Sequence, residues 1–125
     1  MASLPHGRLG LPRAGRLQQA YEFARAREKG QRIVKGCLIA NWLRLESGAR
    51  PRLGVIASKK VGPAVIRNRA RRLLRESYRL HQYDLREPVA LVLVARASIV
   101  GKTLFSVERD LLAALRQGKL LDDTQ

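Results

Sequence analysis

Residues 52–80 read RLGVIASKKVGPAVIRNRARRLLRESYRL, a stretch that joins a short apolar run to a long basic one. Residues 52–58 have the apolar, β-branched character of a strand. Pro63 is typical of a helix start, where its missing N–H is not needed, and a helical period continues to about His81. The stretch therefore predicts a strand that leads into a long amphipathic helix.

The predicted helix over residues 63–81 has two opposed faces when it is projected at about 100° per residue. Its apolar face comprises Ile66, Ala70, Leu73, Leu74, Ser77 and Leu80. Its opposite face comprises Arg67, Asn68, Arg71, Arg72, Arg75, Tyr78 and Arg79, and Arg69 flanks the apolar face. Arginines four residues apart destabilise a helix by about 0.2–0.5 kcal/mol per pair. Bound phosphates would turn this destabilisation into stabilisation, so the pattern indicates a polyanion-binding helix.

The charge of the 125 residues is strongly positive and unevenly distributed. Residues 1–50 carry ten Lys+Arg and three acids (+7), residues 51–86 ten and two (+8), and residues 87–125 five and five (0), which gives the formal net charge of +15. Such a distribution indicates a nucleic-acid-binding surface built from the first two thirds of the chain.

The sequence shows no sign of membrane insertion or export. No run approaches the roughly 18–20 apolar residues of a membrane span, and the first 30 residues lack the apolar core of a secretory signal. A single cysteine, Cys37, excludes an internal disulfide. We therefore expect a cytoplasmic protein without membrane contact.

The remaining segments predict an α+β fold. We expect a helix over 17–29 that Gly30 ends, one or two strands over 33–46 that would split near Gly36, and antiparallel pairing with 52–58. The unbroken VALVLVA of residues 89–95 predicts a strand buried on both faces. After a loop at 98–101, Thr103 or Ser106 caps a last helix that runs to Arg116, before Gly118.

This order, α-β-β-(β)-α-β-α, predicts a two-layer α/β sandwich with helices on one sheet. We expect a flexible basic arm over 1–15, one domain over 16–118 and a C-terminal tail over 119–125.

The sequence gives no catalytic constellation of its own. The acids are scattered, without a metal-binding cluster at a strand end, and no Ser/His/Asp arrangement, Walker loop or dinucleotide-binding glycine pattern occurs. We interpret His81 as a capping or phosphate-contacting residue and Cys37 as a small core residue in a strand. Any chemistry that the protein serves is therefore expected to reside on a partner.

Residues 58–76, SKKVGPAVIRNRARRLLRE, resemble the signature of the bacterial ribonuclease P protein subunit, and the resemblance extends from about Arg16 to Arg116. It implies a left-handed β-α-β crossover. It further implies a ribonucleoprotein endoribonuclease that hydrolyses precursor tRNA to remove the 5′ leader, with Mg²⁺ and catalysis on the RNA subunit. The implied partners are the ribonuclease P RNA and precursor tRNA, without an obligate protein partner.

The resemblance and the helix projection together give the expected RNA-binding residues. They are Lys59, Lys60, Arg67, Asn68, Arg69, Arg71, Arg72, Arg75 and Arg79.

The resemblance also implies a leader-binding cleft between the first helix and the sheet. Its expected residues are Phe23, Arg27, Asn41 and Ser58. By helical spacing alone either Tyr21 or Phe23 could stack on a base, and the resemblance favours Phe23. Arg27 and Asn41 depart from the family pattern, because aromatic residues are common there in relatives.

A ribosomal or other structural RNA-binding protein of similar fold would share the charge but not the SKKVG…RNR spacing. A DNA-binding regulator would need a short recognition helix after a tight turn and a dimer surface, which nothing in the sequence marks.

Overall fold

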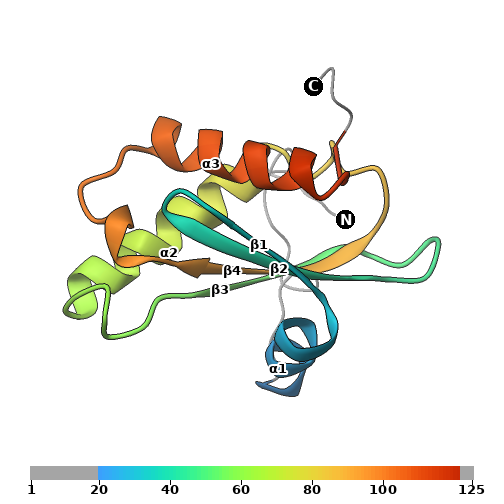
Figure 1. Ribbon diagram of the computed structural model, residues 1–125, viewed down its shortest axis with the longest axis horizontal. Coiled ribbons are helices and arrows are strands. Elements are labelled where there is room, and N and C mark those ends of the chain that lie inside the picture. Colours follow the sequence, from blue (N-terminus) through green and yellow to red (C-terminus); the bar gives the residue numbers. More distant parts are fainter. Residues whose placement is uncertain (1–19, 122–125) are drawn as a thin grey trace, which may run out of the picture.

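The computed structural model describes residues 20–121, and the side chains of residues 24–121. Three helices and four strands follow one another as α1 (Ala20–Lys29), β1 (Gln31–Lys35), β2 (Leu38–Arg44), β3 (Arg52–Ile56), α2 (Ala64–Arg79), β4 (Val89–Ala95) and α3 (Leu104–Gln117) (Figure 1). A short 3-10 helix, Ala97–Ile99, replaces part of the loop expected after β4. The element order is confirmed, including the split near Gly36. The arm predicted over 1–15 lies outside the described residues.

The four strands form one mixed sheet in the order β1-β2-β4-β3. β1 pairs antiparallel with β2, and β2 with β4, whereas β3 runs parallel to β4. The expected antiparallel pairing of residues 52–58 with the preceding strands is therefore wrong, because β4 lies between β2 and β3. The physical reason is the composition of β4, which is buried along nearly its whole length and so takes a central position.

Two parallel neighbours, β3 and β4, are joined through α2. This crossover places the basic helix directly after an edge strand, with residues 57–63 as the connection. Its left-handed sense stays a prediction of the family resemblance.

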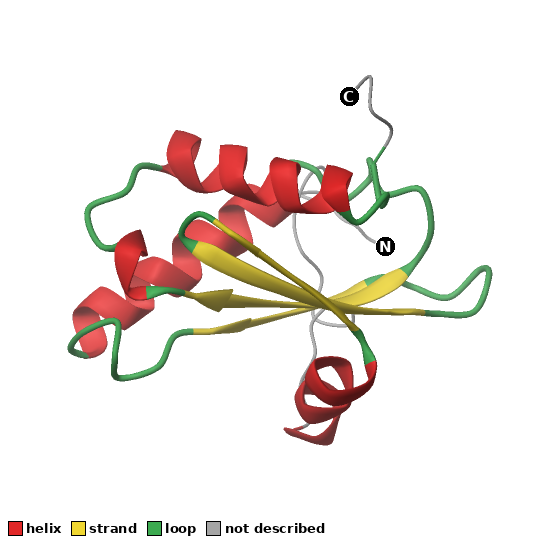
Figure 2. Ribbon diagram, in the orientation of Figure 1, coloured by secondary structure: helices red, strands yellow, loops and turns green. Residues whose placement is uncertain are grey.

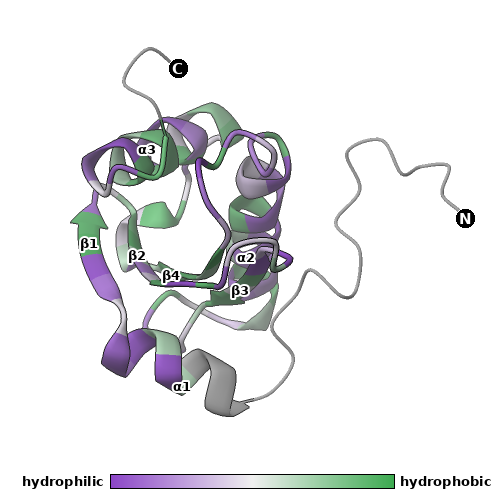
Figure 3. Ribbon diagram, turned by 90° about the vertical axis from the view of Figure 1, so that its right-hand side faces the viewer, coloured by the Kyte–Doolittle hydropathy of each residue, from purple (hydrophilic) through white to green (hydrophobic). Residues whose placement is uncertain are grey.

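Helices lie on both sides of the sheet (Figures 1 and 2). α2 and α3 pack on one face, and α1 lies across the other, as the view along the sheet in Figure 3 also shows. On the first face the main core includes Leu38, Trp42, Leu53, Leu74, Leu91, Leu93, Leu111 and Leu115. On the second, Ala26 of α1 packs with Ala90 and Val92 of β4. The sheet, expected in a two-layer arrangement, is therefore sandwiched between helices.

The C-terminal end of α3 is fixed by the core. Thr103 caps this helix, since its Oγ1 accepts a hydrogen bond from the Ser106 N–H (3.2 Å), and Gly118 follows its last residue. Leu120 and Leu121 are buried, and the Leu120 carbonyl accepts from the Arg86 N–H (2.9 Å). The packed domain therefore extends past residue 118, where the sequence placed its end.

Candidate nucleic-acid interface

The helix α2 buries the face that its sequence predicted. Ala70, Leu74 and Ser77 are buried, and Ile66 and Leu73 are partly buried against the same core. Pro63 stands in extended conformation just before Ala64, so the helix begins one residue later than expected. With its apolar side fixed on the sheet, α2 has a defined outward side.

That outward side is basic. Its exposed members, with the two lysines before the helix, are Lys59, Lys60, Asn68, Arg69, Arg72 and Arg75. Arg67, Arg71 and Arg79 are partly buried at the flanks. The structure thus gathers on one helix and its N-terminal approach all nine residues that the sequence assigned to RNA binding; we call this set the α2 basic face.

Tyr78 is an exception to the projected faces, because it is only 2% exposed and belongs to the core. Its projected direction borders the apolar face, and its ring is large enough to reach the core from there. Burial raises the pKa of its hydroxyl to about 12. The expectation that Tyr78 lies among the arginines is wrong.

Several guanidinium groups of the α2 basic face are held by backbone carbonyls. Arg71 donates to the Ala57 carbonyl (3.3 Å) and to Asn68 Oδ1 (2.7 Å). On the other flank, Arg69 donates to the Lys102 carbonyl (3.1 Å). Each guanidinium has five N–H donors, so these bonds orient the group and leave donors for a phosphate.

Arg79 differs from the other arginines because it pairs with Glu76, the one acid of α2. Arg79 Nε donates to Glu76 Oε1 (3.0 Å). The hydrogen bond from Arg79 holds the pKa of Glu76 below its usual value, and Glu76 raises the pKa of Arg79. The positive charge of the α2 basic face is therefore carried chiefly by the residues before Glu76.

His81 lies just beyond α2 and is enclosed by carboxylates. Its Nδ1 lies 3.1 Å from Asp84 Oδ2, and its Nε2 lies 2.5 Å from Glu108 Oε2 of α3. Because two acids beside one ring disfavour a phosphate, these contacts favour a structural role for His81 over the phosphate-contacting interpretation. The residue links the end of α2 to α3.

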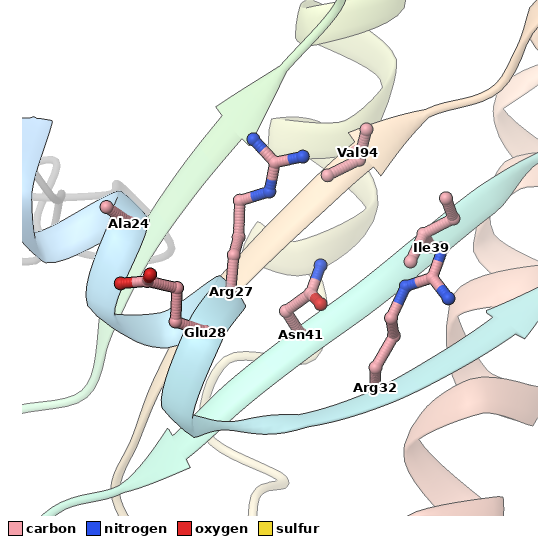
Figure 4. A pocket seen from close by; sticks show the side chains of 7 residues that line it. All are labelled: Ala24, Arg27, Glu28, Arg32, Ile39, Asn41 and Val94. Atoms are coloured by element: carbon pink, nitrogen blue, oxygen red, sulfur yellow. The ribbon is translucent and has the colours of Figure 1, made fainter.

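A pocket of about 450 Å³ lies on the opposite face of the sheet, between α1 and the strands (Figure 4). Its lining residues are Ala24, Arg27, Glu28, Arg32, Ile39, Asn41 and Val94. In the close-up, Arg27 of α1 and Arg32 of β1 lie on either side of Asn41, which is 3% exposed on β2. We call this pocket the α1 cleft.

The α1 cleft includes two of the four residues expected to bind the leader, Arg27 and Asn41. The side chain of Phe23 lies outside the described part of the chain. Ser58 is not part of the lining; its hydroxyl accepts from the Lys60 N–H (3.3 Å) in the turn before α2.

Comparison with known families shows which protein family has this arrangement. The family model described as Ribonuclease P matches residues 11–119. The chain belongs to the ribonuclease P protein family. The ribonuclease P protein component of Desulfovibrio desulfuricans is 39% identical over 110 residues, which cover 86% of this chain and 85% of the relative. As a member of this family, the chain is the protein subunit of ribonuclease P, an endoribonuclease holoenzyme of tRNA 5′ maturation.

Solved structures of ribonuclease P proteins share the fold. The Staphylococcus aureus protein superposes with a TM-score of 0.75 at 24% identity, covering 88% of this chain and 100% of the other. The Thermotoga maritima protein gives a TM-score of 0.71 at 21% identity, covering 82% and 96%. The four-stranded mixed sheet with its three helices is therefore the ribonuclease P protein fold.

The structure also defines the surroundings of the cysteine and of the acidic residues. Cys37 is buried and lies in the turn between β1 and β2 rather than in a strand. Burial is the main cause that raises the pKa of its thiol to about 12, so the residue belongs to the core and is not a nucleophile. Among residues 20–121, no group of three His, Cys, Asp or Glu could hold a metal ion. No helix in that range is long and apolar enough to cross a membrane.

Sequence reasoning missed Arg32 as a lining residue of the α1 cleft. Arg32 stands directly opposite Asn41 in the β1–β2 register. That pairing depends on the exact hairpin turn, and a shift by one residue would move Arg32 to the other face of the sheet. The only signal available was a basic residue directly before the strand region predicted over 33–46.

Proposed function

We propose that the α2 basic face binds the catalytic RNA of ribonuclease P, that the α1 cleft holds the single-stranded 5′ leader of precursor tRNA, and that the RNA subunit hydrolyses the phosphodiester bond. The observation that carries the proposal is the α2 basic face: its arginines lie outward on a helix whose other side is fixed in the core.

Arginine chemistry favours a structured RNA as the partner of α2. The planar guanidinium binds phosphate oxygens in a bidentate manner and stacks on bases. The first turn of α2 contains no acid, and no side chain caps its N–H groups, so the positive end of the helix dipole adds to Lys59 and Lys60. Binding would release counterions and remove the repulsion between neighbouring arginines.

The shape and lining of the α1 cleft favour a single strand. Arg27 and Arg32 supply two cations for phosphates on its rim, and Asn41 supplies an amide for hydrogen bonds at its floor. Apolar contacts come from Ile39 and Val94. A duplex about 20 Å wide would meet this cleft only with its backbone, whereas an unpaired strand places bases and phosphates inside it.

The chemistry belongs to the RNA subunit in this proposal. Mg²⁺ prefers several oxygen ligands, usually including carboxylates, and the described residues bring no such group together. We therefore place Mg²⁺ with the RNA, where it would supply metal-assisted hydrolysis. The protein's part is to bind, orient and retain the substrate.

Reconstitution tests the proposal. Mixed with ribonuclease P RNA at low Mg²⁺ concentration, the protein should increase precursor-tRNA cleavage at the mature 5′ end, and without the RNA it should cleave nothing. Cleavage by the protein alone would contradict the assignment of catalysis, and failure to bind or stimulate the RNA would contradict the assignment of α2.

A further inference from the structure

The proposed function does not use the exposed hydrophobic side chains near the starts of α2 and α3. Three large hydrophobic side chains are exposed there: Val65 (73%), Val100 (50%) and Phe105 (70%). Val65 is the second residue of α2, Phe105 is the second residue of α3, and Val100 precedes α3. Figure 1 shows the starts of α2 and α3 at the same end of the molecule, on its left side.

A hydrogen bond links these segments. Arg69 lies one helical turn after Val65, and its guanidinium donates to the Lys102 carbonyl (3.1 Å). Lys102 stands between Val100 and Phe105 in the chain. The exposed apolar residues therefore adjoin the α2 basic face through Arg69.

Phe105 is exposed although α3 has a well-formed apolar side. Val107, Leu111, Ala114 and Leu115 are buried along that side. Phe105 projects to the opposite side, one turn before the exposed Arg109. An aromatic ring left in water forgoes the stabilisation that burial would give, so the folded chain alone gives no reason for a ring at this position.

The surroundings of Phe105 are positively charged. Lys102 precedes it by three residues, Arg109 follows it by one helical turn, and Arg69 donates to the Lys102 carbonyl. The two acids of the same part of α3 are engaged elsewhere: Glu108 contacts His81 (2.5 Å), and Asp110 accepts from the Cys37 N–H (3.0 Å). An exposed aromatic face with basic residues around it suits a nucleobase with its phosphates better than an apolar protein surface.

We propose that Phe105 is a stacking platform for an unpaired base of the catalytic RNA, with Arg69, Lys102 and Arg109 contacting the adjacent phosphates. The proposal rests on the proposed function of α2 and extends that interface onto α3. The catalytic RNA is the occupant, rather than the leader, because this surface lies on the α2–α3 side of the sheet and the α1 cleft lies on the other.

Affinity measurements with ribonuclease P RNA test the platform. Phe105→Ala should weaken binding about 5- to 150-fold, the range expected for one lost base stack. The slope of log affinity against log salt concentration should stay unchanged, because no phosphate contact is removed. Phe105→Tyr should bind like the wild type. Tyr83→Ala is the matched control, because Tyr83 is equally exposed (71%) and lies outside this surface.

Fluorescence gives a second, direct readout. In Phe105→Trp, the new indole should be quenched when the RNA binds, whereas Trp42 is 2% exposed and should report little change. Tyr83→Trp should show no quenching. Unchanged melting temperatures for all variants would confirm that an exposed side chain was replaced without loss of folding.

Three results would overturn the platform. The first is that Phe105→Ala binds the RNA with wild-type affinity, and the second is that Phe105→Trp shows no quenching. The third is quenching by a leader oligonucleotide instead of the catalytic RNA. Each of these results would leave the α2 assignment intact. Failure of the wild-type protein to bind the RNA would instead overturn the proposed function, and the platform with it.

Discussion

At the scale of single residues, Asp110 fixes the turn between β1 and β2. Its Oδ2 accepts a hydrogen bond from the buried Cys37 N–H (3.0 Å). Gly36 has a φ of +57°, and a Cβ there would lie 2.1 Å from Asp110 Oδ2. Arg96 donates to the Gly36 carbonyl (2.9 Å). The hairpin turn, and through it the β1–β2 register that forms the α1 cleft, is therefore held by α3.

Asp110→Ala should lower the free energy of unfolding by about 1–3 kcal/mol, because it leaves the buried Cys37 N–H unpaired. Urea unfolding measures the loss. Asp110→Asn keeps an acceptor oxygen and should recover most of the stability. Equal losses for both variants would show that the carboxylate charge, and not the hydrogen bond, stabilises the turn.

The buried hydroxyl of Tyr78 makes stability depend on pH in alkaline solution. Its pKa is raised from 10.0 to about 12 in the folded protein. Below pH 10 the group is protonated in both states and adds no pH dependence. Between pH 10 and about 12 the unfolded chain loses the proton first, so the free energy of unfolding falls by roughly 2–3 kcal/mol in total.

Tyr78→Phe should not show this part of the decrease in the free energy of unfolding at alkaline pH, because it has no hydroxyl to ionise. The measurement is the free energy of unfolding of both proteins from pH 9 to pH 12, compared as a difference so that other titrating groups cancel. Parallel curves over this range would show that Tyr78 is accessible to solvent in the folded state.

At the scale of the element, the two sides of α2 have different roles. Its apolar side holds the β3–β4 crossover to the sheet, and its outward side carries the arginines. Near the C-terminal end the charge is reduced by the Arg79–Glu76 pair, and His81 ties the chain to α3. RNA contacts are therefore expected chiefly from the residues before Glu76.

Arg72→Ala and Arg50→Ala form a matched pair, because both residues are exposed and each variant loses one positive charge. Arg72→Ala should weaken binding to ribonuclease P RNA and reduce the slope of its salt dependence by about 1. Arg50→Ala, in the loop after β2, should leave both nearly unchanged. Equal effects of the two variants in a salt titration would indicate that net charge alone drives binding.

At the scale of the whole molecule, the sheet separates the two proposed interfaces. The α2 basic face lies on one side, and the α1 cleft lies on the other. β4 contributes to both sides, with Leu91 and Leu93 in the main core and Val94 in the cleft lining. A buried strand thus positions one proposed RNA site relative to the other.

Arg27→Ala should weaken binding of leader-bearing precursor tRNA to the reconstituted holoenzyme more than binding of mature tRNA. Because Arg27 and Arg72 share no partner and lie on opposite sides of the sheet, their effects on precursor binding should add within about 0.5 kcal/mol in a double variant. Equal losses for precursor and mature tRNA would argue against the leader assignment, and strong non-additivity would argue against separate sites.

The sequence determined the elements and the helix face proposed to bind RNA, since both depend on local patterns. The amphipathic projection of residues 63–81 placed the arginines opposite the core, and VALVLVA at residues 89–95 specified a buried strand. Glycine and threonine at the ends of α3 marked its limits. Such signals need only the periods of helix and strand and the chemistry of helix ends.

Only the tertiary structure decided which residues from distant segments share a surface. It placed β4 between β2 and β3, set Arg32 opposite Asn41, buried Tyr78, enclosed His81 between two carboxylates, and brought Arg69 to Lys102 beside Phe105. These contacts depend on strand order, register and helix packing. The burial of apolar surface over the whole chain determines these features, and no single segment contains that information.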